Sequence, residues 1–297
     1  MSSFAAQSSQ STRWSVIISA VRGAAHESSG APMQDAAGYG GNPDTGVFVA
    51  AVADGHGHPR HFRSDRGSNF AMKVAVSEAR EFAMRIDGLH DKNPGNQSSA
   101  VERLARSILV PEIVQRWHSE VNVDLTERPF SEKERRRAGG DVPVFAYGTT
   151  LLMALVAGST LALCQIGDGD IIVIRPDGAV DRPVPDDPSN DGRFTSSMCQ
   201  LNAVEAFRCT VLDLSDCPVA GVFLATDGFG NAQVADPWYP AVGRDLLAFS
   251  QAHGVTWMRA QMPVWAARCA SSEGSGDDVA LALLLARAED SKAEGLC

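Results

Sequence analysis

Aspartates recur where apolar segments of this chain meet glycine. Asp-Gly is a common turn dipeptide, so a single case would carry little information. Four such places in one chain indicate more than turns, because converging ionised carboxylates are costly to bury and repel one another unless a cation lies between them. The four segments are VADG, IGDGD, LATDG and GDDVAL, with the carboxylates of Asp54, Asp168, Asp227, Asp277 and Asp278.

The donors offered by these segments are oxygen atoms. Carboxylates, a backbone carbonyl and water suit hard divalent cations, Mg²⁺ or Mn²⁺, rather than zinc. Gly55 directly follows Asp54, and a glycine there lets the backbone turn tightly and approach an ion. The pattern therefore predicts a Mn²⁺ or Mg²⁺ site built from segments far apart in the chain.

Three histidines follow Asp54 within the segment HGHPRH, at His56, His58 and His61. The run approaches the H-x-H-x-D-H pattern of zinc hydrolases. Arg60 occupies the position of that pattern's aspartate ligand, and a zinc site would leave the Asp-Gly segments without a role. A zinc hydrolase that uses these histidines is therefore the lesser alternative, and His58 and His61 are interpreted as polar loop residues.

Several elements must position these side chains. Apolar recurrence at three- and four-residue steps predicts a helix over 64–86 and a second helix that Pro111 ends or kinks. The segment TERPFSEKERRRAGGDVP, with its cluster of arginines, is predicted to be a solvated loop; contact with a phosphorylated partner is the alternative. Strands are expected at 14–21, 46–54, three times within 147–178 with the turns AGST and GDGD, in RCTVLDL, in AGVFLATDG and at 278–286, with helices around 243–270.

These elements define a fold class. Hairpin-like turns imply antiparallel pairing, and strands that are apolar on both faces fit sheets covered by each other on one side and by helices on the other. The sequence thus predicts an α+β fold with two mostly antiparallel sheets flanked by helices. We expect one domain over 13–288, a disordered Ser/Gln-rich tail at 1–12 and a C-terminal tail at 289–297.

Composition limits the partners. The formal net charge is −10, and no long basic run is present, which argues against nucleic acid or an anionic membrane as the main partner. The chain shows no signal-peptide pattern and no apolar segment of membrane-spanning length. Its six cysteines are scattered without a C-x-x-C pair, which is typical of reduced thiols. These features predict a cytoplasmic protein, and we expect a monomer.

An ordered series of motifs spans most of the chain and resembles the metal-dependent protein phosphatases of the 2C type (PPM), in a bacterial branch. The resemblance implies an α-β-β-α four-layer sandwich with a two-metal centre that hydrolyses phosphoserine or phosphothreonine through an activated water. It also implies a phosphorylated protein as substrate and a cognate Ser/Thr kinase as a possible partner. The series is QDA (34–36), VADGHG (52–57), YGTTL (147–151), IGDGD (166–170), LATDGFGNA (224–232) and GDDVAL (276–281).

The resemblance also assigns roles. Asp54 matches the aspartate that bridges both metal ions, and the carbonyl of Gly55 matches a backbone ligand. Asp227 and Asp277 match the carboxylates of the other ion, with Asp277 preferred to Asp278 because of its place before the strand. Asp35 matches an acidic residue that acts through metal-bound water. His56 matches the general acid that protonates the leaving oxygen.

Two departures from the family pattern bear on activity. Gly30 stands where the family usually places a phosphate-gripping arginine, and Arg22 or His26 are the candidates to replace it as substrate-binding residues. Asn231 stands where many members carry a further aspartate, which weakens the case for a third metal ion at Asp168. A catalytically weakened phosphatase fold that binds phosphoproteins as a scaffold is therefore the alternative to an active enzyme.

Overall fold

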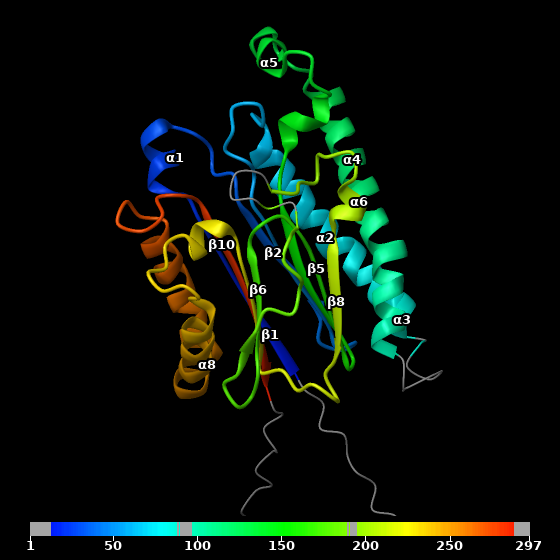
Figure 1. Ribbon diagram of the computed structural model, residues 1–297, viewed down its shortest axis with the longest axis vertical. Coiled ribbons are helices and arrows are strands. Elements are labelled where there is room, and N and C mark those ends of the chain that lie inside the picture. The colour runs from blue at the N-terminus through cyan, green and yellow to red at the C-terminus, as the bar shows by residue number, and fades with distance from the viewer. Residues whose placement is uncertain (1–12, 88, 90–96, 189, 191–194, 288–297) are drawn as a thin grey trace, which may run out of the picture.

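The computed structural model describes residues 13–87, 89, 97–188, 190 and 195–287. The tails expected at 1–12 and 289–297 lie outside these residues. The described chain forms two facing β-sheets with helices on their outer sides (Figure 1). The α+β sandwich expected from the strand and helix patterns is confirmed.

The first sheet joins the two ends of the described chain. Its strand order is β1-β10-β9-β6-β7, and every neighbouring pair is antiparallel. Val, Ile, Leu and Ala dominate the four longer strands, and such residues pack well on a pleated surface. The strands are β1 (Arg13–Val21), β6 (Asp170–Ile174), β7 (Val180–Asp181), β9 (Gly221–Ala225) and β10 (Val279–Arg287).

The second sheet is also antiparallel throughout, in the order β2-β3-β4-β5-β8. Every residue of β4 and β5 is buried, as expected for strands covered on both faces. The strands are β2 (Ala36–Asn42), β3 (Val47–Ala53), β4 (Leu151–Ala157), β5 (Thr160–Ile166) and β8 (Arg208–Asp213).

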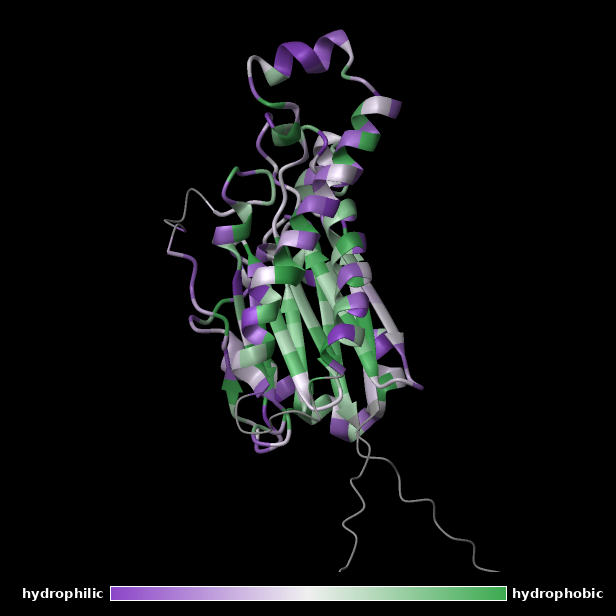
Figure 2. Cartoon of the chain, turned by 90° about the vertical axis from the view of Figure 1, so that its right-hand side faces the viewer, coloured by the Kyte–Doolittle hydropathy of each residue, from purple (hydrophilic) through white to green (hydrophobic). Residues whose placement is uncertain are grey.

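Helices cover the outer face of each sheet. Buried side chains of α2 and α4 pack on the second sheet, and those of α8 pack on the first. Side chains of the two facing sheets form a third apolar cluster between them, and Figure 2 shows these strands as predominantly hydrophobic. The longer helices are α2 (Ser64–Asp87), α3 (Gln97–Leu104), α4 (Val110–Glu127) and α8 (Tyr239–Cys269).

Shorter helical segments lie mainly near one end of the sandwich. The helix that was expected to end or kink at Pro111 does not end there. The π-helical turn η2 precedes Pro111, and the chain stays helical through α4. The wider turn accommodates a residue that lacks a backbone N–H. The short segments are α1 (Ala24–Ser29), η2 (Ala105–Leu109), α5 (Glu132–Ala138), η3 (Pro143–Tyr147), α6 (Ala203–Ala206) and α7 (Asp227–Gly230).

The solvated loop expected around residues 126–143 is wrong in part, because α5 forms within it. Ser131 caps this helix by accepting from the Glu134 backbone N–H, and the Glu134 carboxylate accepts from the Ser131 N–H. This reciprocal arrangement is a capping box. Gly139 follows α5 and has a positive φ of 60°, so the helix has a recognisable beginning and end.

The hairpin expected at GDGD is also wrong. β4 and β5 do form a hairpin through the AGST turn, but β6 pairs with β9 in the other sheet. The segment 167–169 therefore crosses between the sheets. Asp168 consequently lies at their junction rather than at the tip of a hairpin.

Two expectations from composition can be compared with the described residues. Cys164, Cys199, Cys209, Cys217 and Cys269 are free thiols, while Cys297 lies outside the described part. No helix within the described ranges combines the length and apolarity needed to cross a bilayer.

Candidate active site

A cavity of about 240 Å³ opens at the end of the sandwich where the acidic segments converge. Five aspartates from five separate segments line it. Strand ends, the crossover between the sheets and the start of α7 supply them, so residues spread over most of the chain share one space. The lining consists of His26, Gln34, Asp35, Asp54, Gly55, His56, Gly57, Asp168, Thr195, Asp227 and Asp277.

The backbone at Asp54 is fixed by the next strand. The carbonyl oxygen of Asp54 accepts from Thr149 Oγ1 and from the Thr150 N–H, each at 2.8 Å. Gly55 N–H donates to the Gln34 carbonyl oxygen at 3.1 Å. A Cβ at Gly55 would lie 2.6 Å from that same oxygen, so only glycine allows this close approach.

Asp35 begins this set from the segment before β2. Its side chain is buried, 6% exposed, and accepts a 2.7 Å hydrogen bond from Thr226 Oγ1. Burial raises the pKa of Asp35 well above its ordinary value, and the carboxylates of Asp278, Asp227 and Asp277 raise it further. The Thr226 hydrogen bond opposes this rise without cancelling it.

Asp54 shows the same imbalance. Burial raises its pKa well above the ordinary value, and Asp35 and Asp227 add to the rise. The Asp227 carboxyl thus raises the pKa of Asp54 both through its charge and through its close approach.

The remaining carboxylates come from the crossover and from the start of β10. Burial raises the pKa of Asp168 and of Asp277, and Asp227 contributes to both rises. Asn231 Nδ2 donates to Asp227 Oδ2 at 3.1 Å, so the residue that replaces a family aspartate holds an existing carboxylate instead.

The Asp278 carboxylate contacts other segments of the protein, whereas its neighbour Asp277 faces the cavity. Asp278 is 2% exposed and accepts from the Gly23 N–H at 2.7 Å and from the Gln34 N–H at 2.5 Å. His26 Nδ1 lies 2.8 Å from Asp278 Oδ2, the oxygen that also accepts from the Gln34 N–H. Asp278 thereby joins α1, the segment before β2 and β10, and only Asp277 lines the cavity.

The three histidines of HGHPRH differ in their surroundings. His56 lines the cavity, and its Nε2 lies 2.8 Å from Ser197 Oγ. Burial, aided by His61, lowers the pKa of His56 to about 4. His61 Nδ1 lies 2.5 Å from the Phe145 carbonyl oxygen, and His58 is exposed.

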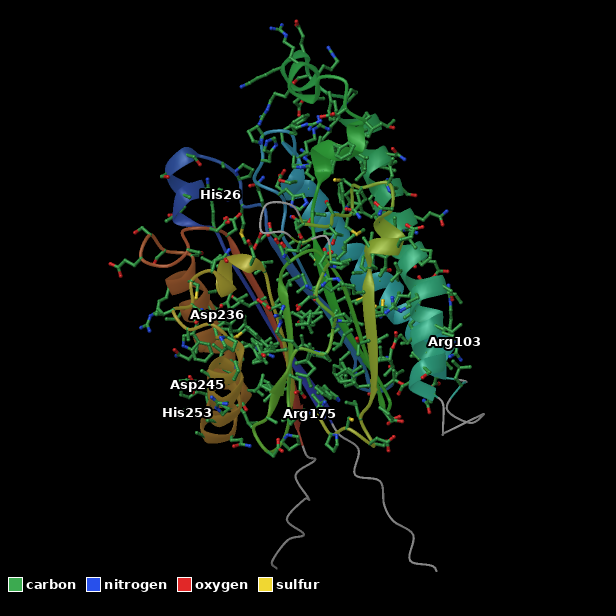
Figure 3. All side chains as sticks on the ribbon, in the orientation of Figure 1. His26, Arg103, Arg175, Asp236, Asp245 and His253 are labelled. Carbon is green, nitrogen blue, oxygen red and sulfur yellow. The ribbon has the colours of Figure 1, made fainter. Side chains whose placement is uncertain are left out.

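The two candidates for the missing arginine behave differently. His26 belongs to α1, where Figure 3 labels it, and lines the cavity. Arg22 does not line it, because its guanidinium donates to the carbonyl oxygens of His26 and Ala31. The described lining contains no Arg or Lys. Thr195, which the sequence did not single out, also lines the cavity.

The donors fit a divalent cation chemically. All five side chains are carboxylates. The raised pKa values of Asp35, Asp54, Asp168 and Asp277 report negative charge that only protons or a cation can neutralise. No three His, Cys, Asp or Glu side chains within the described ranges already stand at ligand spacing. His56 Nε2 lies against Ser197 Oγ, and His61 Nδ1 lies against the Phe145 carbonyl oxygen, so these two rings are not arranged as a zinc site.

Comparison with known proteins places the chain in a family. Residues 22–265 match the model of protein phosphatase 2C. The chain therefore belongs to the protein phosphatase 2C family and is a protein phosphatase. The resemblance carried by the motif series is confirmed, although no curated protein matches the chain.

Solved structures share the fold at low identity. A bacterial serine phosphatase superposes with a TM-score of 0.59 at 15% identity, covering 93% of this chain and 98% of its own. The catalytic domain of the serine/threonine phosphatase PstP, in complex with two manganese ions, gives 0.53 at 17% identity, covering 93% and 99%. PppA, a regulatory component of T6SS in Pseudomonas aeruginosa, gives 0.56 at 14%, covering 93% and 100%.

Proposed function

We propose that this protein hydrolyses phosphoserine and phosphothreonine in proteins with two Mn²⁺ or Mg²⁺ ions held in the carboxylate cavity. The observation that carries the proposal is the convergence of five aspartates from distant segments in one cavity. The manganese ions of PstP, a protein of the same fold, support the choice of metal. Phosphorylated proteins, and a cognate kinase that produces them, are the partners that this activity implies.

Each acidic residue has a place in this proposal. Asp54 would bridge the two ions with the Gly55 carbonyl as a further ligand, and Asp227 and Asp277 would hold the second ion. Asp35 would act through water, and Asp168 is the candidate for a loosely held third ion. When bound, the ions would supply Lewis-acid activation of a water molecule and neutralise phosphoryl oxygens.

His56 would protonate the leaving oxygen of serine or threonine. Its lowered pKa makes the free ring neutral at pH 7, so this role requires a substrate phosphate dianion beside the ring to raise the pKa. We expect His56→Gln to lower kcat about 100-fold on a phosphothreonine peptide. On p-nitrophenyl phosphate, whose leaving group needs no proton, the loss should be only severalfold. Equal losses on both substrates would contradict the role.

A scaffold that binds phosphoproteins without turnover is the second candidate. It is favoured by Arg22, whose guanidinium is occupied by backbone carbonyls, and by the described lining that lacks an arginine. Both readings require metal binding, and only the enzyme requires turnover. An assay of turnover therefore separates them.

A metal-titrated phosphatase assay on wild type and Asp54→Ala is the central test. Wild type should hydrolyse p-nitrophenyl phosphate and a phosphothreonine peptide with millimolar Mn²⁺, and EDTA should abolish this. Asp54→Ala should lower turnover by about 1,000-fold or more. Calorimetry should show that the variant loses Mn²⁺ binding. Wild type that binds Mn²⁺ but turns over neither substrate would favour the scaffold.

A further inference from the structure

A cationic arm projects beyond the end of the sandwich at which the cavity opens (Figure 1). The α5 arm, defined as residues 131–141, forms the tip of the molecule and is largely hydrophilic (Figures 1 and 2). Its helix α5 buries no residue. A helix with no buried face contributes little to the core, so its fixed presence needs another explanation.

The arm is held in place by three polar contacts to the segment that follows His56. Glu134 accepts a 2.9 Å hydrogen bond from Arg63 Nε. Asp141 accepts a 2.7 Å bond from Arg60 Nε, and Arg137 donates to the Pro59 carbonyl oxygen at 3.0 Å. The arm is therefore tied to the loop 57–63, whose other end enters the cavity at His56.

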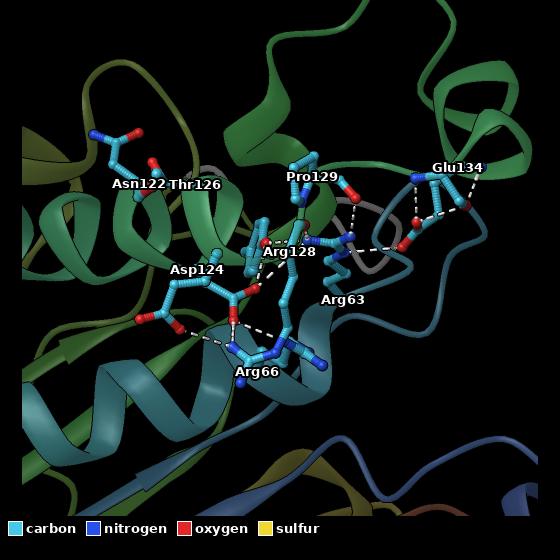
Figure 4. Close-up of polar contacts among 11 residues, drawn as sticks. Arg63, Arg66, Asn122, Asp124, Thr126, Arg128, Pro129 and Glu134 are labelled. Atoms are coloured by element: carbon cyan, nitrogen blue, oxygen red, sulfur yellow. Dashed lines mark hydrogen bonds and ion pairs between the residues drawn. The ribbon is translucent and has the colours of Figure 1, made fainter.

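Arg63 anchors this connection from inside the protein (Figure 4). It is 7% exposed, and its guanidinium lies 4.7 Å from the Phe130 ring centroid. It also donates to the Tyr147 hydroxyl at 2.7 Å. A buried arginine that reaches the arm gives α5 a defined orientation.

The anchoring leaves the outer face of α5 positive. Glu134 is the only acidic residue between Lys133 and Arg137, and its carboxylate is turned to Arg63. Arg136 pairs with Glu132 in an exposed i,i+4 pair, which binds weakly. Within the part of the chain that the structure describes, Lys133 and Arg135 make no ion pair, and Arg135 Nη1 donates to the Phe130 carbonyl oxygen at 2.5 Å. Cations thus gather on the arm of a protein whose net charge is −10.

We infer that the α5 arm is a docking surface for acidic residues that flank the phosphorylated residue of a protein substrate. The inference rests on the proposed function. An extended peptide advances at most about 3.5 Å per residue, so residues beyond the phosphorylated one must leave the acidic cavity and pass a neighbouring surface. The arm is the neighbour tied to the cavity loop, and its charge selects carboxylates.

The test compares two phosphothreonine peptides of equal length, with aspartates or with asparagines around the phosphothreonine. Wild type should show a KM about five- to tenfold lower for the aspartate peptide, and this preference should shrink with added salt. The variant K133E/R135E should lose the preference while keeping kcat and its activity on p-nitrophenyl phosphate. K133Q/R135Q should lose part of it, and circular dichroism checks the fold of both variants.

A matched control carries the same change of net charge elsewhere. Arg103 on α3 and Arg244 on α8 are exposed and lie away from the arm (Arg103 is labelled in Figure 3). R103E/R244E should keep the aspartate preference. Equal KM values of wild type for the two peptides, or equal losses in the control and arm variants, would overturn the inference.

Binding of the unphosphorylated aspartate peptide, followed by fluorescence anisotropy, separates docking from catalysis. Weaker binding by K133E/R135E than by wild type supports docking, whether or not any substrate is turned over. Absence of turnover would contradict only the proposed function. Equal binding by both overturns docking even if turnover is found. Tighter binding of the wild-type protein to phosphatidylserine vesicles than to the peptide would overturn docking of acidic peptides in favour of a membrane surface.

Discussion

Two clusters of buried charge lie near the same end of this protein, and they differ in balance. In the cavity, aspartates face one another, and burial together with mutual repulsion raises the pKa of Asp35 and Asp54. In the charge network at the end of α4, Asp124 is 3% exposed and is met by Arg63, Arg66 and Arg128 (Figure 4).

The pKa values record this difference. The pKa of Asp124 is lowered although burial opposes it, because Tyr147, Arg128 and Arg66 hydrogen bond with its carboxylate. The network thus carries its own counter-charges and stabilises a local arrangement. Among the described residues, the cavity lining contains no Arg or Lys to act as counter-charge. Binding of a cation there would therefore relieve the repulsion between the carboxylates. Buried aspartates thus stabilise the fold in the Asp124 network, whereas in the cavity they favour cation binding.

The largest expected effect on stability comes from breaking the balanced cluster. Asp124→Ala leaves Arg63 buried beside Tyr147 without its central carboxylate, and we expect the free energy of unfolding to fall by about 3 kcal/mol. Urea denaturation measures this. Asp216→Ala, at an exposed site, serves as control and should change it by less than about 0.5 kcal/mol. A loss no greater than the control's would show that the network is not structural.

The unbalanced cluster should respond with the opposite sign. Asp35→Asn removes one repelling charge and leaves an oxygen to accept from Thr226. In EDTA at pH 7 we expect the free energy of unfolding to rise by about 1 kcal/mol. Calorimetry should show weaker Mn²⁺ binding. A variant less stable than wild type in EDTA would contradict the description of this cavity as strained by charge.

The smallest effect sharpens the comparison through pH. Arg63 lowers the pKa of Glu134 to about 2 from an ordinary 4.5. This carboxylate therefore contributes stability that is present above pH 5 and is lost as the pH falls toward 2. Between pH 6 and pH 3, the stability difference between wild type and Glu134→Gln should shrink by about 1 kcal/mol or less. A difference independent of pH would mean that the ion pair does not matter.

Much of the fold followed from local patterns, and its misses have physical causes. Apolar strands and the α2 helix carry their own periodicity, so their positions were predictable. β2 was missed because AAGYGGN is rich in glycine; a Cβ at Gly38 would lie 2.0 Å from Met72 Sδ, so helix packing selects glycine there. The pairing of β6 was mistaken because a turn motif does not specify which sheet the next strand joins.

The aspartates that line the cavity were identifiable from the sequence, whereas the contacts that surround them were not. Asp277 and Asp278 are adjacent, and adjacent residues at a strand point to opposite sides, which agrees with their separate surroundings. The exclusion of Arg22 from the cavity depends on backbone carbonyls that only the folded turn brings together. The α5 helix had a signal, the Ser131–Glu134 capping box, which the density of charge around it obscured.

The pairing of β1 with β10 has a practical consequence. Arg13 lies opposite Arg287 at one end of this ladder, and Val21 lies opposite Val279 at the other, beside the acidic residues. During synthesis the last wall of the cavity is therefore absent until β10 leaves the ribosome. Both ends of the described chain, Arg13 and Arg287, lie at the pole opposite the cavity.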